Sequence, residues 1–367
     1  MEKIYIVLVT WNGERDVPLF CDSLKNSIQP GCAQLIVVDN NSQDSTLEII
    51  SKKIPEAIII KNNSNTGFAI GSNQGMRYAL DHGAEYIMLA NQDLVFEKVW
   101  LEPLKNTLDT NTRIAAVQPL VMLYPDKEKI NSCGNVLHYL GFGYTRGYLQ
   151  KWGQTPFLKE KLGSDPIFEC KNLEEIGAFS GSAVLLRASI LKEVGLLDEH
   201  YFMYHEDADL GWRFRLAGYT CVICTDSVVY HHYEFSRSIL KFYYMERNRY
   251  LMMLKNYSLH TLLLLAPFFF FWELGMIFYS LFGFLFMKKT IGFPEKVKGY
   301  VYFGSIKNWK ALLKERKRVQ TMRKIPDREI IKLSTPVIEF QDLESPIITY
   351  IANPLSRFYW WIIKRFI

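Results

Sequence analysis

The stretch HEDADLGWR (205–213) concentrates residue types that proton transfer uses. Glu206, Asp207 and Asp209 place three carboxylates within four residues, where like charges raise one another's pKa values and repel. A protein rarely keeps such a cluster without a purpose, so the stretch indicates a functional site. The alternative is a helix N-terminus whose acids favour the helix dipole, and this alternative describes Asp209 best.

Asp93 in LANQDLVF (89–96) raises a different chemical question, because it is one carboxylate between two apolar runs. An isolated acid at the end of a buried strand is costly unless something stabilises its charge. The sequence therefore predicts a partner for Asp93.

Short apolar runs rich in β-branched residues alternate with helix-compatible stretches in the first hundred residues. The runs are 4–10, 34–39, 57–61 and 86–91, and the helix-compatible stretches are 18–27, 45–53 and 71–82. Alternation of this kind is typical of βαβ units and a mostly parallel sheet. We therefore predict an α/β fold with a Rossmann-like central sheet flanked by helices.

Each of these runs ends in polar residues, and the carboxyl ends of parallel strands meet at one edge of a sheet, where ligands bind. The clusters are Thr10-Trp11-Asn12, Asp39-Asn40-Asn41, Asn62-Asn63 and Asn91-Gln92-Asp93. Asp39 can accept hydrogen bonds from a base or a ribose. Its alternative role is to cap the following helix, which suits Asp44 or Ser45 better.

The stretch NTGFAIGSNQG (65–75) places Gly67, Gly71 and Gly75 around a predicted helix start. Free N–H groups and the positive end of the dipole favour anionic oxygen atoms there. Alternatively, the glycines only permit close packing of helix on sheet. GxGxxG and GxxxxGK[ST] are both absent, which argues against NAD enzymes and P-loop NTPases.

Six motifs in order resemble those of family 2 glycosyltransferases with the GT-A fold, in particular the rhamnosyltransferase-like and galactofuranosyltransferase-like branch. They are VTWNG, VVDNNSQDST, NTGFAIGSNQGMRYA, LANQDLV, GSAVLLR and GLLDEHYFMYHEDADLGWRFRLAGY. The similarity runs from about Ile4 to Ser238, some two thirds of the chain. It implies a Rossmann-like GT-A catalytic domain that binds a nucleotide sugar.

The resemblance also implies which residues bind the donor. The nucleotide-sugar residues are Thr10, Trp11, Asn12, Asp39, Asn41, Asn65, Gly67, Phe68, Asn73, Asn91 and Gln92. Gly181 and Ser182 precede another apolar strand, and small residues there let the donor or acceptor sugar approach the backbone.

In similar enzymes a DxD-like motif lies at the end of the strand that corresponds to 86–91, and its last carboxylate binds Mg²⁺ or Mn²⁺ bridging the diphosphate. Here the motif is Asn91-Gln92-Asp93, so only Asp93 is present, and the other ligands must come from phosphate, water or another side chain. His231 or His232 supplies one of them. Neighbours on a strand point to opposite faces, so the choice stays open, with His231 slightly favoured.

Glu206 and Asp207 match the family's paired acids, of which the second acts as general base. The resemblance implies that Asp207 deprotonates the acceptor hydroxyl in a single inverting displacement, while Glu206 positions its neighbours.

The C-terminal third differs in composition. Residues 261–287 are nearly uncharged, although Pro267 and Glu273 interrupt the run, which exceeds the roughly 20 residues needed to cross a bilayer. Residues 288–332 hold fourteen Lys or Arg against four acids, a net charge of +10. Both features favour an anionic membrane surface, as does the aromatic and basic end, 357–367. Whether 261–287 spans, re-enters or lies in the interface stays open, and a buried helical hairpin is the soluble alternative.

We thus expect a catalytic domain at 1–240, divided into a nucleotide-sugar half (1–95) and an acceptor half (96–240), and a membrane-association region at 241–367. The predicted reaction is metal-dependent transfer of a rhamnose-like or other hexose from a dTDP- or UDP-linked donor to a glycan, carried on a lipid, in cell-envelope polysaccharide biosynthesis. The expected location is the cytoplasmic face of the membrane, and six scattered cysteines favour reduced thiols.

No nucleic-acid partner is expected, and a homo-oligomer is possible. A sugar nucleotidyltransferase would need a Gly-rich loop with Arg and Lys near the N-terminus, which VTWNGERD lacks. The remaining alternative is a membrane scaffold with a degenerate, non-catalytic sugar-nucleotide domain, because the first acid of the DxD-like motif is missing.

Overall fold

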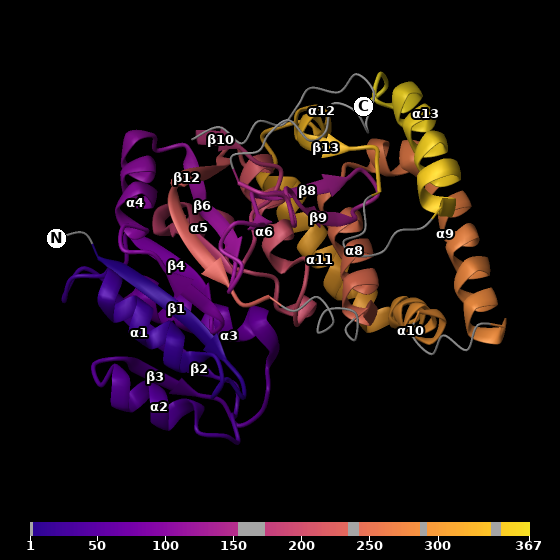
Figure 1. The fold of residues 1–367 in the computed structure, drawn as a ribbon. Coiled ribbons are helices and arrows are strands. Elements are labelled where there is room, and N and C mark those ends of the chain that lie inside the picture. Colours follow the sequence, from indigo (N-terminus) through magenta and orange to yellow (C-terminus); the bar gives the residue numbers. More distant parts are fainter. Residues whose placement is uncertain (1–2, 153–172, 234–241, 287–291, 339–345) are drawn as a thin grey trace. The chain divides into compact units, whose positions relative to one another are not determined.

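The computed structural model describes residues 3–152, 173–233, 242–286, 292–338 and 346–367. The chain forms two compact units (Figure 1). Unit 1 comprises Met1–Asn135, Thr145–Phe202 and Tyr219–Tyr233, and unit 2 comprises Val136–Tyr144, Met203–Gly218 and Glu234–Ile367. Two short segments from within 1–240 therefore fold together with the C-terminal third.

A mixed sheet forms the centre of unit 1, with the strand order β10-β12-β6-β11-β4-β1-β2-β3. The strands β4, β1, β2 and β3 are mutually parallel, whereas β11 runs antiparallel to both β4 and β6. The short strands β5 and β7 pair with β12 and β6. The strands are β1 Ile4–Thr10, β2 Gln34–Asp39, β3 Ile58–Lys61, β4 Tyr86–Asn91, β5 Leu94–Phe96, β6 Ile114–Leu123, β7 Ile130–Ser132, β10 Leu173–Glu175, β11 Ala183–Arg187 and β12 Thr220–His231.

Helices pack on this sheet because the apolar strands bury both of their faces. Along β1, Ile6 and Leu8 belong to the core that includes α1, whereas Val7 and Val9 contact α3. The predicted α/β fold with a helix-flanked central sheet is thereby confirmed. The helices are α1 Val17–Ser27, α2 Thr46–Lys53, α3 Gly67–Asp81, α4 Leu101–Thr110, α5 Ala188–Val194 and the 3₁₀ helix η1 Glu199–Tyr201.

Helix α3 begins four residues earlier than the predicted start at 71. Two glycines inside it permit close packing: a Cβ on Gly71 would lie 2.9 Å from Val9 Cγ1, and one on Gly75 would lie 2.4 Å from Val7 Cγ1. For Gly71 and Gly75 the packing interpretation is therefore the one that the structure supports.

Unit 2 is mostly helical, with a short sheet in the order β13-β8-β9. Its elements are β8 Asn135–His138, β9 Gly143–Thr145, α6 Glu206–Leu216, α8 Phe242–Asn256, α9 Leu259–Phe286, α10 Phe293–Phe303, α11 Ile306–Met322, α12 Asp327–Ile330, η2 Ile331–Leu333, β13 Ser334–Thr335, the π-helix η3 Ile348–Ala352 and α13 Asn353–Ile363. Side chains of α11 close the C-terminus of α8, because Arg316 and Gln320 donate hydrogen bonds to carbonyl groups of residues 254–257. The helices of unit 2 thus depend on one another.

The cysteines differ from the expectation of six reduced thiols. Cys21, Cys32, Cys221 and Cys224 are free, but Cys133 is disulfide-bonded. The expectation is wrong for Cys133, because wide spacing in sequence does not prevent two thiols from meeting in the fold.

Candidate active site

The ends of β1 and β4 meet at one edge of the sheet and are joined by a predicted site residue, Gln92. Its Oε1 accepts hydrogen bonds from Thr10 Oγ1 at 2.7 Å and from the Trp11 N–H at 3.1 Å. The Trp11 side chain stays about half exposed, at 52%. Gln92 therefore fixes the backbone from which Trp11 projects.

The loops after β1 and β2 are held together at the same edge. Asp39 is buried, and its carboxylate accepts hydrogen bonds from the Ser42 N–H at 3.1 Å and the Ser42 hydroxyl at 2.5 Å. Asn12 Oδ1 accepts from the Gln43 N–H at 2.9 Å, and Gln43 donates to Asn41 Oδ1 at 3.1 Å. Asp39 does not cap α2, whose Thr46 N–H is bound by Asp44. The structure thus brings Thr10, Trp11, Asn12, Asp39, Asn41 and Gln92 together.

The start of α3 differs from the expected anion site. The Phe202 carbonyl accepts from the N–H groups of Phe68 at 2.7 Å and Ala69 at 3.2 Å, and Asn65 Oδ1 accepts from the Gly67 N–H at 2.9 Å. A Cβ on Gly67, whose φ is +83°, would lie 2.5 Å from the Phe202 oxygen. The expectation of free N–H groups at this helix start is wrong, because a carbonyl from far along the chain already binds them.

Asn73 is also placed differently from the expectation that it reaches the nucleotide. It is buried, with Nδ2 donating to the Leu197 carbonyl at 2.8 Å and Glu199 Oε1 at 3.0 Å, while Oδ1 accepts from the Leu197 N–H at 3.0 Å. These bonds use the amide to hold the 197–199 loop, so the nucleotide role of Asn73 stays a prediction that its present partners do not favour.

Asn40, which sequence reasoning did not select, joins the loop after β2 to the segment between β3 and the start of α3. Its Nδ2 donates to the Gly67 carbonyl at 3.1 Å, and its Oδ1 accepts from Asn62 Nδ2 at 2.9 Å and Thr66 Oγ1 at 2.8 Å. The polar run DNN contained the signal, but nothing in it distinguished the buried asparagine from its exposed neighbour.

The partner of Asp93 is His231. His231 Nε2 lies 3.0 Å from Asp93 Oδ1, and its Nδ1 lies 3.0 Å from Asn131 Oδ1. His232 points elsewhere, with Nδ1 3.4 Å from Asp16 Oδ1. Of the two adjacent histidines, the structure therefore places His231 beside the DxD-like motif. Asn131 was missed, because no motif contains it.

The 3.0 Å between the two side chains is a hydrogen-bond distance, and it is also compatible with two ligands of one cation. Two donors about 2.1 Å from one cation and at right angles to each other lie about 3 Å apart. In the ranges that the structure describes, no group of three or more His, Cys, Asp or Glu side chains is arranged to hold a metal ion. Asp93 and His231 therefore provide two donors, and a cation held by them would need its other ligands from water or a diphosphate.

Ser182 and Gly181 lie next to this motif. The Ser182 carbonyl accepts from the Asn91 N–H at 2.9 Å, and the Ser182 hydroxyl lies 2.9 Å from that of Ser180. The antiparallel pairing of β11 with β4 thus places these small residues at the edge that carries Asp93.

Glu206 and Asp207 belong to unit 2, at the first turn of α6. The residues before them have unusual backbone angles, with φ of 65° at Tyr204 and 69° at His205. Asn248 Nδ2 holds this segment by donating to the Met203 and Tyr204 carbonyls at 2.8 and 2.7 Å. Left-handed angles at such bulky residues are costly and are concentrated at functional sites.

The two acids have different surroundings. Glu206 is buried, and its Oε2 has no hydrogen-bond partner among the residues that the structure describes. Burial, followed by the nearby charges of Asp207 and Asp209, raises the pKa of Glu206 well above its usual value. Asp207 is partly exposed, and its Oδ1 accepts from the Ala208 N–H at 2.7 Å. Of the two, Asp207 is therefore the accessible carboxylate.

A prediction about stability follows for Glu206→Gln. Because the folded pKa is raised, the stabilisation from protonated Glu206 is complete below the unfolded pKa near 4.5 and is lost as pH rises through the folded pKa. Between these values the unfolding free energy of the wild type should fall, relative to that of the variant, by about 1.4 kcal/mol per pH unit. Denaturant unfolding of both proteins at pH 5, 6 and 7 measures this, and parallel pH dependence would refute the raised pKa.

Asp209 has a structural role that goes beyond the helix dipole. It is fully buried, 2.8 Å from Arg213 Nε and 2.9 Å from both Lys255 Nζ and Asn256 Nδ2. Asp209 thus pairs with Arg213 one turn along its own helix and joins α6 to α8.

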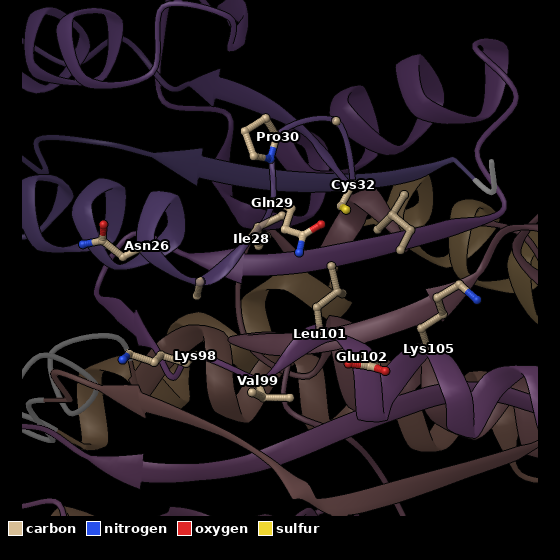
Figure 2. A pocket seen from close by; sticks show the side chains of 13 residues that line it. Asn26, Ile28, Gln29, Pro30, Cys32, Lys98, Val99, Leu101, Glu102 and Lys105 are labelled. Carbon is tan, nitrogen blue, oxygen red and sulfur yellow. The ribbon is translucent and has the colours of Figure 1, made fainter.

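A pocket of about 1060 Å³ lies in unit 1 (Figure 2). It is lined by residues 26–32, the segment 98–105 and Ile4. Ile4 begins β1 and Thr10 ends it, so this pocket lies at the opposite ends of the strands from the predicted nucleotide residues.

Comparisons with known proteins agree on one family of enzymes. The model of glycosyl transferase family 2 matches residues 5–195, and that of glycosyl transferase family group 2 matches residues 133–303. The N-acetylglucosaminyl-diphospho-decaprenol L-rhamnosyltransferase of Mycobacterium tuberculosis is 27% identical over 242 residues, covering 62% of this chain and 75% of that protein. The dTDP-rhamnosyl transferase RfbF of Shigella flexneri is 26% identical over 285 residues, covering 72% and 83%.

Among solved structures, GalNAc-T7 with UDP, GalNAc and Mn²⁺ is similar in fold, with a TM-score of 0.52 and 13% identity over 69% of this chain and 47% of that chain. At this identity the likeness shows the fold alone. The sequence similarity is to rhamnosyltransferases, which are hexose-transferring enzymes. Because the first family model spans more than half of its residues, the chain belongs to glycosyl transferase family 2.

Proposed function

We propose that the protein transfers a rhamnose-like or other hexose from a dTDP- or UDP-linked donor to a hydroxyl of a lipid-linked glycan, with inversion and with Mg²⁺ or Mn²⁺. The observation that carries the metal proposal is the 3.0 Å pair of Asp93 and His231 beside the residues predicted to bind the nucleotide. Mn²⁺ in a structure of similar fold supports the use of a divalent cation.

Residues of unit 1 bind the donor in this proposal. Asp39 and Thr10 bind the base and ribose, Trp11 offers an aromatic face, and Gly181 and Ser182 admit the sugar. Asp93 and His231 hold the cation, which when bound neutralises charge on the diphosphate leaving group.

Asp207 is the proposed general base. The acceptor oxygen attacks the anomeric carbon from the face opposite the diphosphate, and its proton passes to the Asp207 carboxylate. A glycosidic bond forms as the bond between the anomeric carbon and the diphosphate oxygen breaks, and the diphosphate leaves with the electron pair. The buried Glu206, whose pKa is raised by burial, positions the helix start.

The relatives' names support the choice of donor and acceptor. One names a dTDP-rhamnosyl transfer, and another names a diphospho-decaprenol lipid as acceptor. An acceptor of this kind lies in a membrane, which agrees with the exposed apolar side chains of α9 and α13. We place the enzyme at the cytoplasmic face, where nucleotide sugars are made.

A donor screen tests the proposal and separates it from a non-catalytic scaffold. Release of nucleoside diphosphate is measured from a panel of dTDP-, UDP- and GDP-sugars, with Mn²⁺ and with a chelator. We expect turnover of one dTDP- or UDP-sugar that requires the metal. Binding of a nucleotide sugar without any turnover, also with a lipid-linked acceptor, would favour the scaffold.

A further inference from the structure

Helix α9 buries some of its side chains in unit 2 and exposes many others. Leu265, Phe268, Trp272 and Glu273 are buried within unit 2. Large apolar side chains are exposed along the helix at Leu259, Leu263, Phe270, Phe271, Leu274, Phe278, Phe282 and Leu285, and Tyr279 and Phe284 near its C-terminal end are exposed as well. The exposed surface of a helix in water is normally polar, so these side chains are matched to an apolar surrounding.

Glu273 is tied into a buried ionic cluster formed by α8, α9 and α10. Its carboxylate lies 2.6 Å from Arg249 Nη2, 2.9 Å from Lys296 Nζ and 2.6 Å from the Tyr250 hydroxyl. Glu246 completes the cluster, 2.6 Å from Lys296 Nζ. Burial opposes ionisation of Glu273, but the charges of Arg249 and Lys296 outweigh it and lower its pKa.

The length of α9 is compatible both with crossing the bilayer and with lying flat in it, and the ionic cluster favours one of these two orientations. Among the residues that the structure describes, α9 is the one helix long and apolar enough to cross a bilayer. Glu273 is the fifteenth of its 28 residues, so crossing would place Glu273 near the middle of the bilayer. Arg249, Glu246 and Lys296 would have to follow it, and charges at that depth are expensive. A flat orientation leaves all four inside the protein.

Two further helices of unit 2 also expose apolar side chains. Helix α13 packs on α9 through Tyr359, whose ring stacks on Phe268 at 4.9 Å, and exposes Leu355, Phe358 and Trp361. Helix α11 has two adjacent exposed stripes. The apolar stripe is Ile306, Trp309 and Leu313, and the basic stripe is Lys307, Lys310, Lys314 and Lys317. Apolar surface beside lysine side chains is complementary to a leaflet that contains anionic lipids.

We propose that α9 does not cross the membrane but lies flat in one anionic leaflet, with its exposed apolar side chains immersed and Glu273 facing the protein, and that α11 and α13 contact the same leaflet. The inference rests on the membrane association proposed above, but it is independent of the transfer chemistry.

A first experiment tests what these exposed side chains of α9 contact, by sedimentation with vesicles of phosphatidylcholine and phosphatidylglycerol. We expect at least tenfold weaker binding for the variant that combines Phe270→Ser, Leu274→Ser and Phe278→Ser. Each substitution removes an apolar side chain whose burial in the lipid would stabilise the bound state. The matched control changes three exposed apolar residues of unit 1 (Leu19→Ser, Val99→Ser, Leu173→Ser) and should bind normally. If the wild type does not bind vesicles but forms a stable dimer, the proposal is overturned, and the exposed apolar residues of α9 contact a second copy of the chain.

A second experiment measures depth. Cys32, the exposed one among the four free cysteines that the structure describes, is replaced by Ser, and a fluorophore is attached to Leu263→Cys, Leu274→Cys or Leu285→Cys. Lipids brominated at defined chain positions should quench all three at one shallow depth. A crossing helix would place residue 274 deeper than both ends by roughly 16 Å, and that profile would overturn the flat orientation.

The basic stripe has its own test. Changing Lys310, Lys314 and Lys317 to Gln should weaken binding to anionic vesicles but not to pure phosphatidylcholine, and equal loss on both would refute the electrostatic contribution. A wild type that binds with the flat depth profile but transfers no sugar would leave this inference standing and contradict the proposed function.

Discussion

Asp207→Asn should lower kcat by about 10²- to 10⁴-fold, the contribution of general base catalysis. The substitution keeps the size of the side chain and its acceptor oxygen for the Ala208 N–H, but it removes basicity. Affinity for the donor should barely change, because Asp207 belongs to the acceptor's chemistry. The measurement is kcat at saturating donor, together with calorimetry of donor binding.

Glu206→Gln is the matched control for this prediction. Glu206 is buried and its pKa is raised by burial, which favours the neutral acid, so an amide should replace it at little catalytic cost. If Glu206→Gln lost turnover while Asp207→Asn kept it, the two roles would be reversed. If both variants stayed active, the acids of HEDADL would only stabilise the start of α6.

Asp93→Ala should reduce the metal-dependent affinity for dTDP or UDP by about 100-fold or more, down to the value measured with a chelator. Substitution of residues that merely orient metal ligands already costs 10- to 100-fold, and Asp93 is the one acid of its motif. Calorimetry with the nucleoside diphosphate, with and without Mn²⁺, measures the change. Circular dichroism should show an unchanged fold.

The adjacent histidines provide an internal control for the metal. His231→Ala should lose most of the Mn²⁺ effect, because its Nε2 faces Asp93. His232→Ala should keep the effect, because His232 faces Asp16. Equal losses in both variants, or unchanged affinity in Asp93→Ala, would remove the metal role from this pair.

The convergence of strand ends could be predicted, because parallel strands end at one edge of a sheet. Thr10 and Asp39 end two such strands, Gln92 follows a third, and the fold places them together. The choice between His231 and His232 could not be predicted, because the alternation along a strand shows only that the two diverge. The face that His231 shares with Asp93 depends on the pairing of β12 with β5.

The predictions failed or lost support where a polar group forms its hydrogen bonds or ion pairs with residues far away in the sequence. The N–H groups at the start of α3 were expected to be free, but the Phe202 carbonyl binds two of them, and Asn73 bonds to residues more than 120 positions away. Glu273 interrupted an apolar run without any visible partner in the sequence, because Arg249 and Lys296 lie on other helices. The sequence pattern of one segment does not show which residues of other segments will contact it.

The configuration of the transferred sugar is the most direct test of the proposed mechanism. With the donor found in the screen, a lipid-linked glycan acceptor and Mn²⁺, proton NMR of the fresh product reports the anomeric centre, and a parallel reaction contains a chelator. We expect the configuration opposite to that of the donor and no product with the chelator. A retained configuration, or undiminished transfer without a divalent cation, would contradict the account.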